Sequence, residues 1–375
     1  MLRPEDWAAL GRSLAGELLL PGSGAYDWAR RPFIARFDEI KPRAVVRCAA
    51  AADVAQALEF TRRFGIEIVA RSGGHDLAGR SSTSGVLLDL TPLDEVELRN
   101  GTVRVGAGVR TGALCEQLHK NKLAIPTGTC PSVGIAGLTL AGGLGILGRA
   151  YGLTLDRLLA VQAVLADGRI VGCDAEHHAD LFWALRGAGA GSLAVAVEFI
   201  FEPLLAPEQT TSFHLAWPYE RASSVIAAWQ RWSPMGPDEL SADLALSAGV
   251  DRGGEPTVEV FGALLAGKAQ ADASLAALIA AAASEPRSVY CRELSYLETC
   301  HFQAEVSAGY DLIEQTSQGE RRRQGYRFTS SEFFASPLPA EAIAALLGAF
   351  TSNRRGGESR AISFAPWGGA YNRPA

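Results

Sequence analysis

The sequence predicts an α+β protein with two structural units. Its 375 residues are well above the roughly 150 residues of a typical domain. In the first half the expected elements follow one another as β-α-β-β-β-α, which favours a mixed α+β fold over a regular βαβ array. After Pro203 the sequence contains few motifs, and a second series of expected strands and helices begins. We therefore expect a first domain at 1–203, a second at 204–365, and a short closing segment at 366–375.

Periodicity and turn residues define the elements of the first domain. Residues 52–64 carry apolar side chains at helical spacing and end before Gly65, a residue that commonly terminates helices. Asp167-Gly168 joins two apolar runs, which indicates a β-hairpin over 158–173. The other expected strands are 43–48, 66–71, 85–90, 102–108 and 193–203, and the other expected helices are 111–121 and 181–187.

The second domain shows the same mixture with few motifs. Strands are expected at 210–217, 257–265 and 360–365, and helices at 219–232, 268–283 and 340–350. Residues 304–325 contain Gly309, Gly319 and the basic triplet 321–323, and show no clear period. We expect an exposed loop there, with the triplet solvated as charge runs usually are.

Composition limits the partners and the compartment. Lys+Arg of 35 against Asp+Glu of 41 gives a net charge of −6, and the longest basic block is three residues, so a nucleic-acid partner is not expected. No apolar run approaches the roughly 18 residues of a membrane-spanning helix, and the N-terminus lacks a signal-peptide pattern. The six cysteines form no CxxC pair. We therefore expect reduced thiols in a cytoplasmic protein without a membrane partner.

Glycine is concentrated in two loops. Of the 40 glycines, 16 fall within residues 73–152, roughly twice the share that even spreading would give. The first glycine loop is 71–79 (RSGGHDLAG), and the second is 126–145. Bare N–H groups in such loops can form a concave site for phosphate oxygens, although two tight turns without a ligand are the alternative. Neither loop has the spacing of a Rossmann fingerprint or a Walker P-loop.

Each loop contains one residue that can act as a nucleophile. His75 lies in the first loop and Cys130 in the second. Taken singly, a histidine is more often an ordinary surface or core residue, and a cysteine is more often a small buried hydrophobe. Zinc is less favoured, because two ligands fall short of a tetrahedral site. Their placement in two phosphate-type loops favours a chemical role for the pair, since imidazole and thiolate are both nucleophiles.

Six motifs follow one another along the chain: RSGGH (71–75), GTCPSVG (128–134), GGLG (142–145), YGLTLD (151–156), LADGRIV (165–171) and DLFWALRG (180–187). With this set in this order, the sequence resembles the berberine-bridge-enzyme-like FAD-linked oxidases of the vanillyl-alcohol-oxidase/PCMH superfamily. The resemblance covers residues 30–203 and resumes weakly at WGGAYNR (367–373). It implies a PCMH-type FAD-binding domain of two α/β subdomains, followed by an α+β substrate domain with an antiparallel sheet and helices.

The resemblance implies FAD bound through two covalent bonds and assigns residues to it, with no metal. His75 matches the histidine bonded to the flavin 8α-methyl, and Cys130 matches the cysteine bonded to flavin C6. Val133 matches a position where a small side chain leaves room for dioxygen, and Val195 matches a backbone contact near the adenine. The other implied FAD-binding residues are Arg71, Ser72, Gly73, Gly74, Asp76, Gly79, Gly128, Thr129, Gly134, Gly137, Leu138, Gly142, Gly143 and Gly145.

The sequence departs from the family pattern at several places, and two of them bear on the active site. Leu77 stands where several members have a tyrosine beside the flavin. Family members also continue past WGGxxNR with a stretch that completes the flavin domain. We therefore interpret 366–375 as the start of a C-terminal return to the FAD domain, and expect the chain to lack the rest. Tyr371 is the candidate catalytic base, with an ordinary structural tyrosine as the alternative.

The leading hypothesis is a flavin oxidase that takes a hydride from an alcohol, hemiacetal or similar group of a bulky small molecule. The expected partners are this small-molecule substrate and dioxygen, which would be reduced to hydrogen peroxide. Oxidative cyclisation or desaturation of a secondary metabolite by the same flavin is an alternative. A flavin-binding module without turnover is another. Sugars, lignan-like alcohols and polyketide or alkaloid intermediates all remain open as substrates.

Overall fold

The fold is taken from a computed structural model of the chain. The structure describes residues 2–188, 193–251, 253–307, 311–316, 319–324 and 327–373, and for 307, 311–316 and 319–324 it describes the backbone alone. The chain divides into two compact units, which are described separately below. The first unit comprises 1–145, 153–205 and 307–330, and the second comprises 146–152, 206–306 and 331–375.

The first unit begins with a four-stranded sheet of order β1-β2-β4-β3. β2 (Ala44–Arg47) and β3 (Ile68–Arg71) run parallel to β4 (Val86–Asp89), and β1 (Glu17–Leu19) is antiparallel to β2. Parallel strands require covered faces, and the side chains of β4 are all buried. The helices of this part are α1 (Pro4–Ser13), α2 (Gly24–Arg30) and α3 (Ala51–Phe64). Gly65, with φ +63°, ends α3 in the left-handed conformation that glycine adopts without steric cost.

An antiparallel five-stranded sheet of order β5-β6-β10-β8-β9 completes the first unit. Its strands are β5 (Val96–Arg99), β6 (Thr102–Gly106), β8 (Leu158–Val164), β9 (Ile170–Asp174) and β10 (Val195–Phe201). The main helices here are α4 (Thr111–His119), α5 (Ile135–Leu140) and α7 (Ala179–Leu185). Short pieces are the strands β7 (Leu123–Ala124) and β11 (Leu204–Leu205) and the 3₁₀ turns η1 (Ala35–Phe37) and η2 (Thr154–Arg157).

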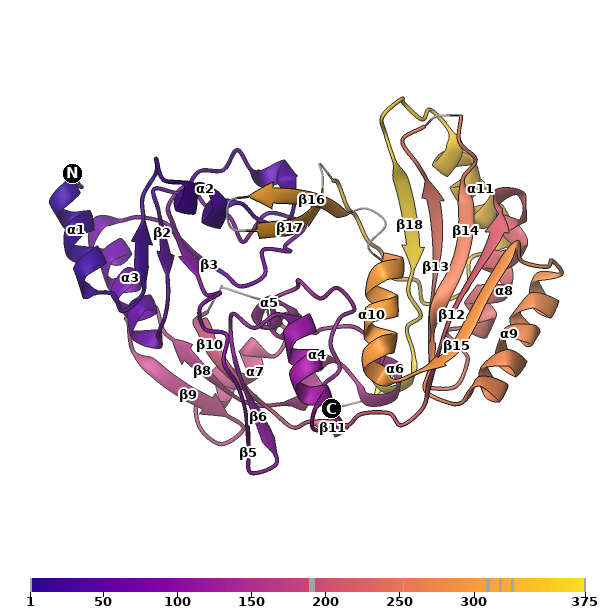
Figure 1. Ribbon diagram of the computed structural model, residues 1–375, viewed down its shortest axis with the longest axis horizontal. Coiled ribbons are helices and arrows are strands. Elements are labelled where there is room, and N and C mark those ends of the chain that lie inside the picture. Colours follow the sequence, from indigo (N-terminus) through magenta and orange to yellow (C-terminus); the bar gives the residue numbers. More distant parts are fainter. Residues whose placement is uncertain are drawn as a thin grey trace. The chain divides into compact units, whose positions relative to one another are not determined.

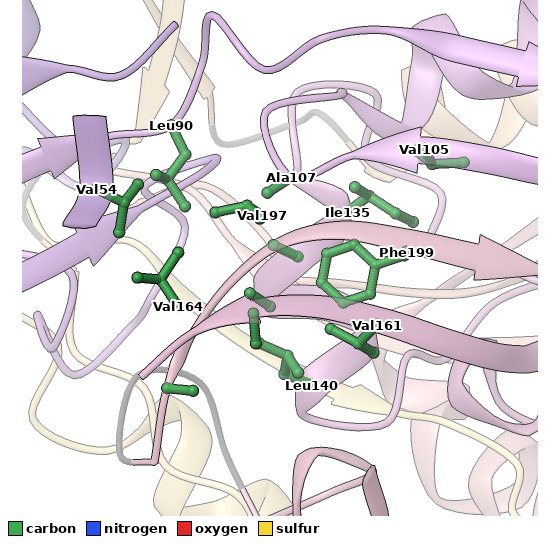
Figure 2. Close-up of a cluster of buried hydrophobic side chains, with 14 of the residues drawn as sticks. Val54, Leu90, Val105, Ala107, Ile135, Leu140, Val161, Val164, Val197 and Phe199 are labelled. Carbon is green, nitrogen blue, oxygen red and sulfur yellow. The ribbon is translucent and has the colours of Figure 1, made fainter. Parts of the chain in front are cut away.

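One hydrophobic core joins the two sheets of the first unit. Figure 2 shows Val54 of α3, Ile135 of α5 and Phe199 of β10 among the side chains of this core. Ile135 and Phe199 are fully buried. Burying a side chain of this size stabilises a fold by about 1.5–3 kcal/mol. The core therefore fixes α5, and with it the glycine loop that precedes this helix.

The second unit contains an antiparallel sheet of order β15-β12-β14-β13-β18. Its strands are β12 (Thr210–Pro218), β13 (Leu240–Ala248), β14 (Thr257–Leu264), β15 (Ser288–Leu294) and β18 (Arg360–Phe364). α8 (Ala222–Trp232), α9 (Lys268–Ala282) and α11 (Ala340–Thr351) cover one face, and α10 (Tyr296–Ser307) lies on the other (Figure 1). The short elements are α6 (Gly148–Tyr151), η3 (Tyr219–Arg221) and η4 (Gly369–Asn372).

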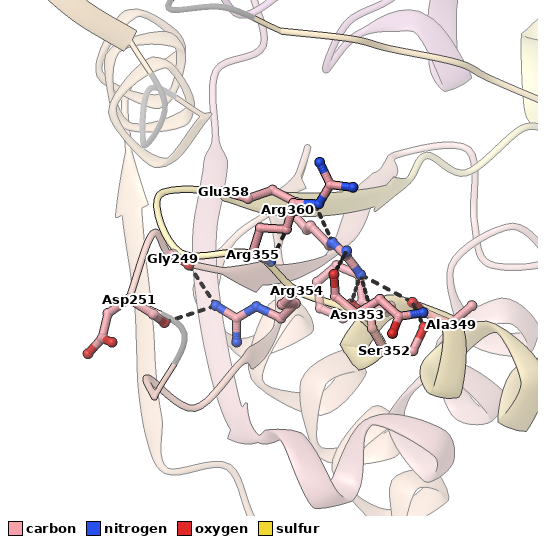
Figure 3. Close-up of polar contacts among 10 residues, drawn as sticks. Gly249, Asp251, Ala349, Ser352, Asn353, Arg354, Arg355, Glu358 and Arg360 are labelled. Carbon is pink, nitrogen blue, oxygen red and sulfur yellow. Dashed lines mark hydrogen bonds and ion pairs between the residues drawn. The ribbon is translucent and has the colours of Figure 1, made fainter.

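Two arginines fasten the end of α11, as Figure 3 shows. The Arg360 guanidinium donates to the carbonyls of Ala349, Phe350, Ser352 and Asn353, at 2.6–3.3 Å. The last carbonyls of a helix have no partner within the helix, so these bonds satisfy groups that otherwise face water. The buried Arg354 donates to the carbonyls of the loop 249–254 that joins β13 to β14.

Most elements expected from the sequence are confirmed within one or two residues. The prediction of a loop at 304–325 is wrong. This stretch contains the end of α10 and an antiparallel pair of strands, β16 (Asp311–Thr316) and β17 (Gly319–Gln324). Such a polar two-stranded ribbon has too few alternating apolar residues to show a strand period. The triplet 321–323 lies in β17, and its side chains are outside the described residues. No helix in the described part of the chain is long and apolar enough to cross a membrane.

Candidate functional site

A pocket of about 230 Å³ lies in the first unit, at the carboxyl end of β3. Its lining comes from residues 28–33, from the first glycine loop with His75, and from Ser132 of the second loop. Asp89, Thr91 and Arg110 complete it. The two loops that the sequence singles out therefore meet at one cavity. The parallel pairing of β3 with β4 places the ends of these strands, Arg71 and Asp89, side by side at its wall.

The two glycine loops approach each other closely at Gly73 and Gly134. A Cβ added to Gly73 would overlap the backbone nitrogen of Gly134, and a Cβ on Gly134 would overlap Ser72 Oγ and the Gly73 nitrogen. The second loop is held in this position by a β-bridge between Arg110 and Gly134. Both glycines are buried, and the contact involves backbone that has little freedom to move. The fold therefore demands glycine at these two positions.

His75 and Cys130 lie on either side of one hydroxyl group. His75 Nε2 is 3.0 Å from Ser132 Oγ, and Ser132 Oγ is 3.4 Å from Cys130 Sγ. All three residues are partly exposed. The His75 ring stacks on Phe33, with ring centroids 3.6 Å apart and planes tilted by 16°. The structure thus brings together the two nucleophiles that are 55 residues apart in the sequence.

The first loop is shaped by its own side chains and by Arg71. The buried Arg71 guanidinium donates to the carbonyls of Ala29, Arg30 and Ser81 and to Ser82 Oγ, at 2.8–3.1 Å. The Asp76 carboxylate accepts hydrogen bonds from the backbone N–H groups of residues 78 and 80. Ser72 Oγ donates to the Ala107 carbonyl at 2.5 Å, and Gly74 and Gly79 have φ of +73° and +79°. The arginine therefore ties the loop to the end of α2.

The turn that carries Cys130 and Ser132 is braced from the start of α4. Thr111 Oγ1 donates to the Cys130 carbonyl at 2.7 Å, and Arg110 Nη1 donates to the Ser132 carbonyl at 3.0 Å. Burial lowers the pKa of the Arg110 guanidinium, and the nearby Asp89 carboxylate partly offsets this. Arg110 thus places a positive charge in the pocket wall.

Three comparisons with known proteins bear on this site. Residues 42–174 match a family described as FAD binding domain. A glucooligosaccharide oxidase from Acremonium strictum, whose structure title names a 6-S-cysteinyl, 8α-N1-histidyl FAD, aligns with a TM-score of 0.80 and 25% identity over 98% of this chain and 76% of that one.

This chain carries an FAD-binding domain. Two curated relatives agree with that conclusion. An uncharacterized FAD-linked oxidoreductase of Bacillus subtilis, YvdP, is 32% identical over 240 residues, 62% of this chain and 53% of the relative. Berberine bridge enzyme-like 23 of Arabidopsis thaliana is 29% identical over 314 residues, 81% of this chain and 58% of the relative. The chain is therefore a homologue of the berberine-bridge-enzyme-like oxidoreductases, as its motifs indicate, and it spans little more than half the length of these two relatives.

The FAD-binding domain presents the chemistry that an anionic dinucleotide requires. No side chain shields the backbone N–H groups of its glycines, and Arg110 adds a half-buried positive charge. Gly137 is exposed, has no heavy atom within 4 Å of an added Cβ, and is the third residue of α5. The fold itself therefore leaves room for a side chain at this position.

The remaining predicted residues of the FAD-binding domain lie in different surroundings, some closely packed and others partly exposed. A Cβ on Gly143 would overlap Thr154 Oγ1, and one on Gly145 would overlap the Thr127 carbonyl. Gly142 and Gly143 have φ of +117° and +87°, which favour glycine. Val195 begins β10 and pairs with Val164. Gly128, Thr129, Val133 and Leu138 are partly exposed along the second loop and α5.

Tyr371 belongs to the second unit, whereas the other predicted site residues belong to the FAD-binding first unit. It lies in η4 and stacks on Trp367, with ring centroids 4.9 Å apart. The buried Arg149 guanidinium is close enough to Tyr371 and Asp238 for both to raise its pKa, against a larger lowering by burial. A tyrosine beside a cation is suited to act as a base, and this role stays a prediction.

Sequence reasoning missed the residues that lie between the predicted ones. Ser132 sits inside the GTCPSVG motif, but only the folded loop shows that it joins His75 to Cys130. Phe33 and Arg110 lie outside every motif used. Little in the sequence indicated either residue, because phenylalanine and arginine are common and their placement at the pocket depends on long-range contacts in the fold.

The second unit has polar side chains on the sheet face opposite α8 and α9. His214 on β12 and Asp243 on β13 both pair with Phe261 of β14, which places them in one row. His214 Nε2 is 3.1 Å from Glu259 Oε2, and this contact lowers the pKa of the Glu259 carboxyl. Burial raises the pKa of Asp243 to about 7. These groups were absent from the sequence-based prediction, since alternation alone does not distinguish a solvated face from a functional one.

Proposed function

We propose that the chain belongs to a flavin oxidase in which FAD is bonded to both His75 and Cys130. The observation that carries the proposal is the single hydroxyl that lies within hydrogen-bonding distance of both nucleophiles. The glucooligosaccharide oxidase with the same type of double attachment supports it. Because the chain spans only part of its relatives' length, activity and substrate are proposals for the whole protein.

In this proposal, some residues hold the FAD by non-covalent contacts and others form bonds to its flavin ring. The N–H groups at Gly73, Gly74 and Gly134 would hold the pyrophosphate and the flavin edge, with Arg110 adding charge. His75 and Cys130 would fix the ring. When bound, the flavin supplies a site that accepts a hydride from the substrate and gives electrons to dioxygen. Val133, next to the Cys130 turn, is proposed to leave room for dioxygen because its side chain is small.

The second unit is proposed to bind the substrate, an alcohol, hemiacetal or similar group of a bulky small molecule. The acid-base row with Asp243, His214 and Glu259 offers hydrogen-bond partners for hydroxyl groups. Tyr371 is proposed as the base that removes the substrate's hydroxyl proton. Dioxygen would then take the two electrons and two protons and leave as hydrogen peroxide.

The covalent part of the proposal is tested by acid denaturation. Wild-type protein should keep its yellow colour in the acid pellet, and intact mass should equal chain plus one FAD. His75→Ala and Cys130→Ala should each retain flavin through the remaining bond, and the double variant should release it. Complete release from the wild type would refute the double attachment.

The redox part is tested with a peroxide assay over oligosaccharides, benzylic alcohols and alkaloid-like secondary alcohols. Peroxide formation with anaerobic bleaching of the flavin supports an oxidase. Bleaching with a cyclised or desaturated product would favour the alternative chemistry on the same flavin. Neither peroxide nor bleaching with any substrate, in protein of verified full length, would favour a binding module without turnover.

A further inference from the structure

We propose that Ser132 is a positioning residue for flavin attachment, because its hydroxyl sets the proton location on His75 and holds Cys130 beside it. This inference rests on the proposed double attachment. It concerns a residue that makes no bond to the flavin itself and acts through the two that do.

The geometry places Ser132 at the centre of a three-group chain. Its Oγ is 3.0 Å from His75 Nε2 and 3.4 Å from Cys130 Sγ. A sulfur contact of this length is within hydrogen-bonding range, because sulfur is larger than oxygen. A serine hydroxyl has one proton to donate and two lone pairs to accept with. It can therefore serve both neighbours at once only by donating to one and accepting from the other.

That restriction couples the location of the proton on His75 to the location of the proton on Cys130. If Ser132 donates to Cys130 Sγ, it accepts from His75 Nε2–H, and the Nδ1 nitrogen of the neutral ring then carries the lone pair. Donation to sulfur favours the thiolate, and a lone pair on Nδ1 makes the ring a nucleophile. The same hydrogen-bond direction thus prepares both groups. The reverse direction keeps the proton on sulfur and leaves Nδ1–H, so neither group is ready to attack.

The surroundings hold Ser132 and His75 in this arrangement. Phe33 stacks on the imidazole at 3.6 Å between centroids, which opposes rotation of the ring. The backbone N–H of Phe33 donates to the Gly74 carbonyl at 2.9 Å, so the stacking partner is tied to the same loop as His75. On the other side, Arg110 holds the Ser132 carbonyl and Thr111 holds the Cys130 carbonyl. The hydroxyl lies between two braced loops.

The attachment balances without any group beyond those already named. At each nucleophile one protein proton, from N–H or S–H, and one hydrogen of the flavin are replaced by the new bond. For each bond, one dioxygen takes the two electrons and two protons and becomes hydrogen peroxide, so the double attachment consumes two dioxygen molecules. His75 Nδ1 is assigned as the bonding nitrogen, since Nε2 faces Ser132. The Nε2 proton of the charged ring that results leaves through Ser132 Oγ.

The test compares Ser132→Ala, Ser132→Thr and Ser132→Val, because the last two match in volume and differ in the hydroxyl. The wild type and variants are purified with FAD present, and the fractions with two, one and no attachments are followed over time by intact mass and by acid release. Without the hydroxyl we expect attachment about 100-fold slower, the lower end of what a positioned proton-transfer group contributes. Ser132→Thr should restore most of the rate, while Ser132→Val should behave like Ser132→Ala.

A second measurement separates this role from a merely structural one. The attachment rate of the wild type should depend on pH through the coupled protons of His75 and Cys130, and in Ser132→Ala this dependence should change in shape. Thermal unfolding and the total amount of FAD bound, with and without a covalent bond, should stay close to wild type. If Ser132→Ala and Ser132→Val attach FAD at the wild-type rate, the inference is wrong while the double attachment stands. If the wild type itself releases all its flavin in acid, the proposed attachment fails first.

Discussion

Replacing Gly134 by alanine should drive the two glycine loops apart and lower both stability and flavin content. The added Cβ would lie under 3.0 Å from Ser72 Oγ and from the backbone nitrogen of Gly73. Gly134 has φ −82° and ψ 135°, a conformation open to alanine, so the expected effect comes from the overlap alone. One of the two colliding atoms is backbone, which cannot swing away as the end of a side chain can.

The magnitude follows from the cost of overpacking. Forcing one extra methyl group into a filled site costs about 1–3 kcal/mol. For a unit of this size each kcal/mol lowers the melting temperature by about 2–4 °C. We therefore expect Gly134→Ala to melt about 2–12 °C below wild type. Since displacement of this loop also moves Cys130 and Ser132, flavin per chain should fall, measured as visible absorbance against protein absorbance.

Gly24→Ala is the matched control in the same unit. Gly24 is the first residue of α2, and no heavy atom lies within 4 Å of an added Cβ. A substitution of this kind changes stability by about 0.5 kcal/mol or less. Thermal unfolding of the three proteins under one set of conditions decides the matter. If Gly134→Ala melts with the control and carries wild-type flavin, the loops are not packed as closely as the structure places them.

Three further predictions concern single side chains. The pKa of Asp243 is about 7 in the folded protein, above its usual value. The folded state is therefore most favoured by this group below about pH 4, and that contribution falls by about 1.4 kcal/mol per pH unit until about pH 7. Asp243→Asn should flatten the change in unfolding free energy between pH 4 and pH 7, and an unchanged slope would contradict the raised pKa. Arg360→Met removes the donors that cap α11 and should cost about 1–3 kcal/mol in urea unfolding, whereas Met in place of the exposed Arg355 should cost little. Arg71→Lys should cost about 2 kcal/mol and reduce flavin content, because one ammonium group cannot reach the four oxygens that the guanidinium binds; wild-type unfolding would show that the loop does not depend on those bonds.

Elements with a strong local signal were predictable from the sequence. α3 has both a helical period and a terminating glycine, and the hairpin of β8 and β9 has Asp167-Gly168 at its turn. β13 was missed although its residues alternate between buried and partly exposed, since small residues such as Ala242 and Ala245 give the alternation little contrast. The ribbon of β16 and β17 was read as a loop because its pairing lies in backbone hydrogen bonds rather than in an apolar face.

Glycine shows most clearly where sequence reasoning stops. The concentration of glycine pointed correctly to two loops that meet at one pocket. It did not distinguish Gly134, where the fold leaves no room for a side chain, from Gly137, where it leaves open space. The first is explained by packing of protein against protein. The second has no such explanation within the described residues, and the open space there matches that at Gly24, so packing does not require glycine at this position.

Ser132 illustrates the same limit for chemistry. A histidine and a cysteine in two glycine-rich loops suggested that the two act together, but their separation of 55 residues says nothing about distance in space. The β-bridge from Arg110 to Gly134 and the parallel pairing of β3 with β4 set that distance, and both are long-range features of the fold. Only after these contacts form does one hydroxyl come to lie between the two nucleophiles. Serine is a common residue type, so only its position in the fold indicates a chemical role. The Thr and Val variants test whether the hydroxyl at that position is needed.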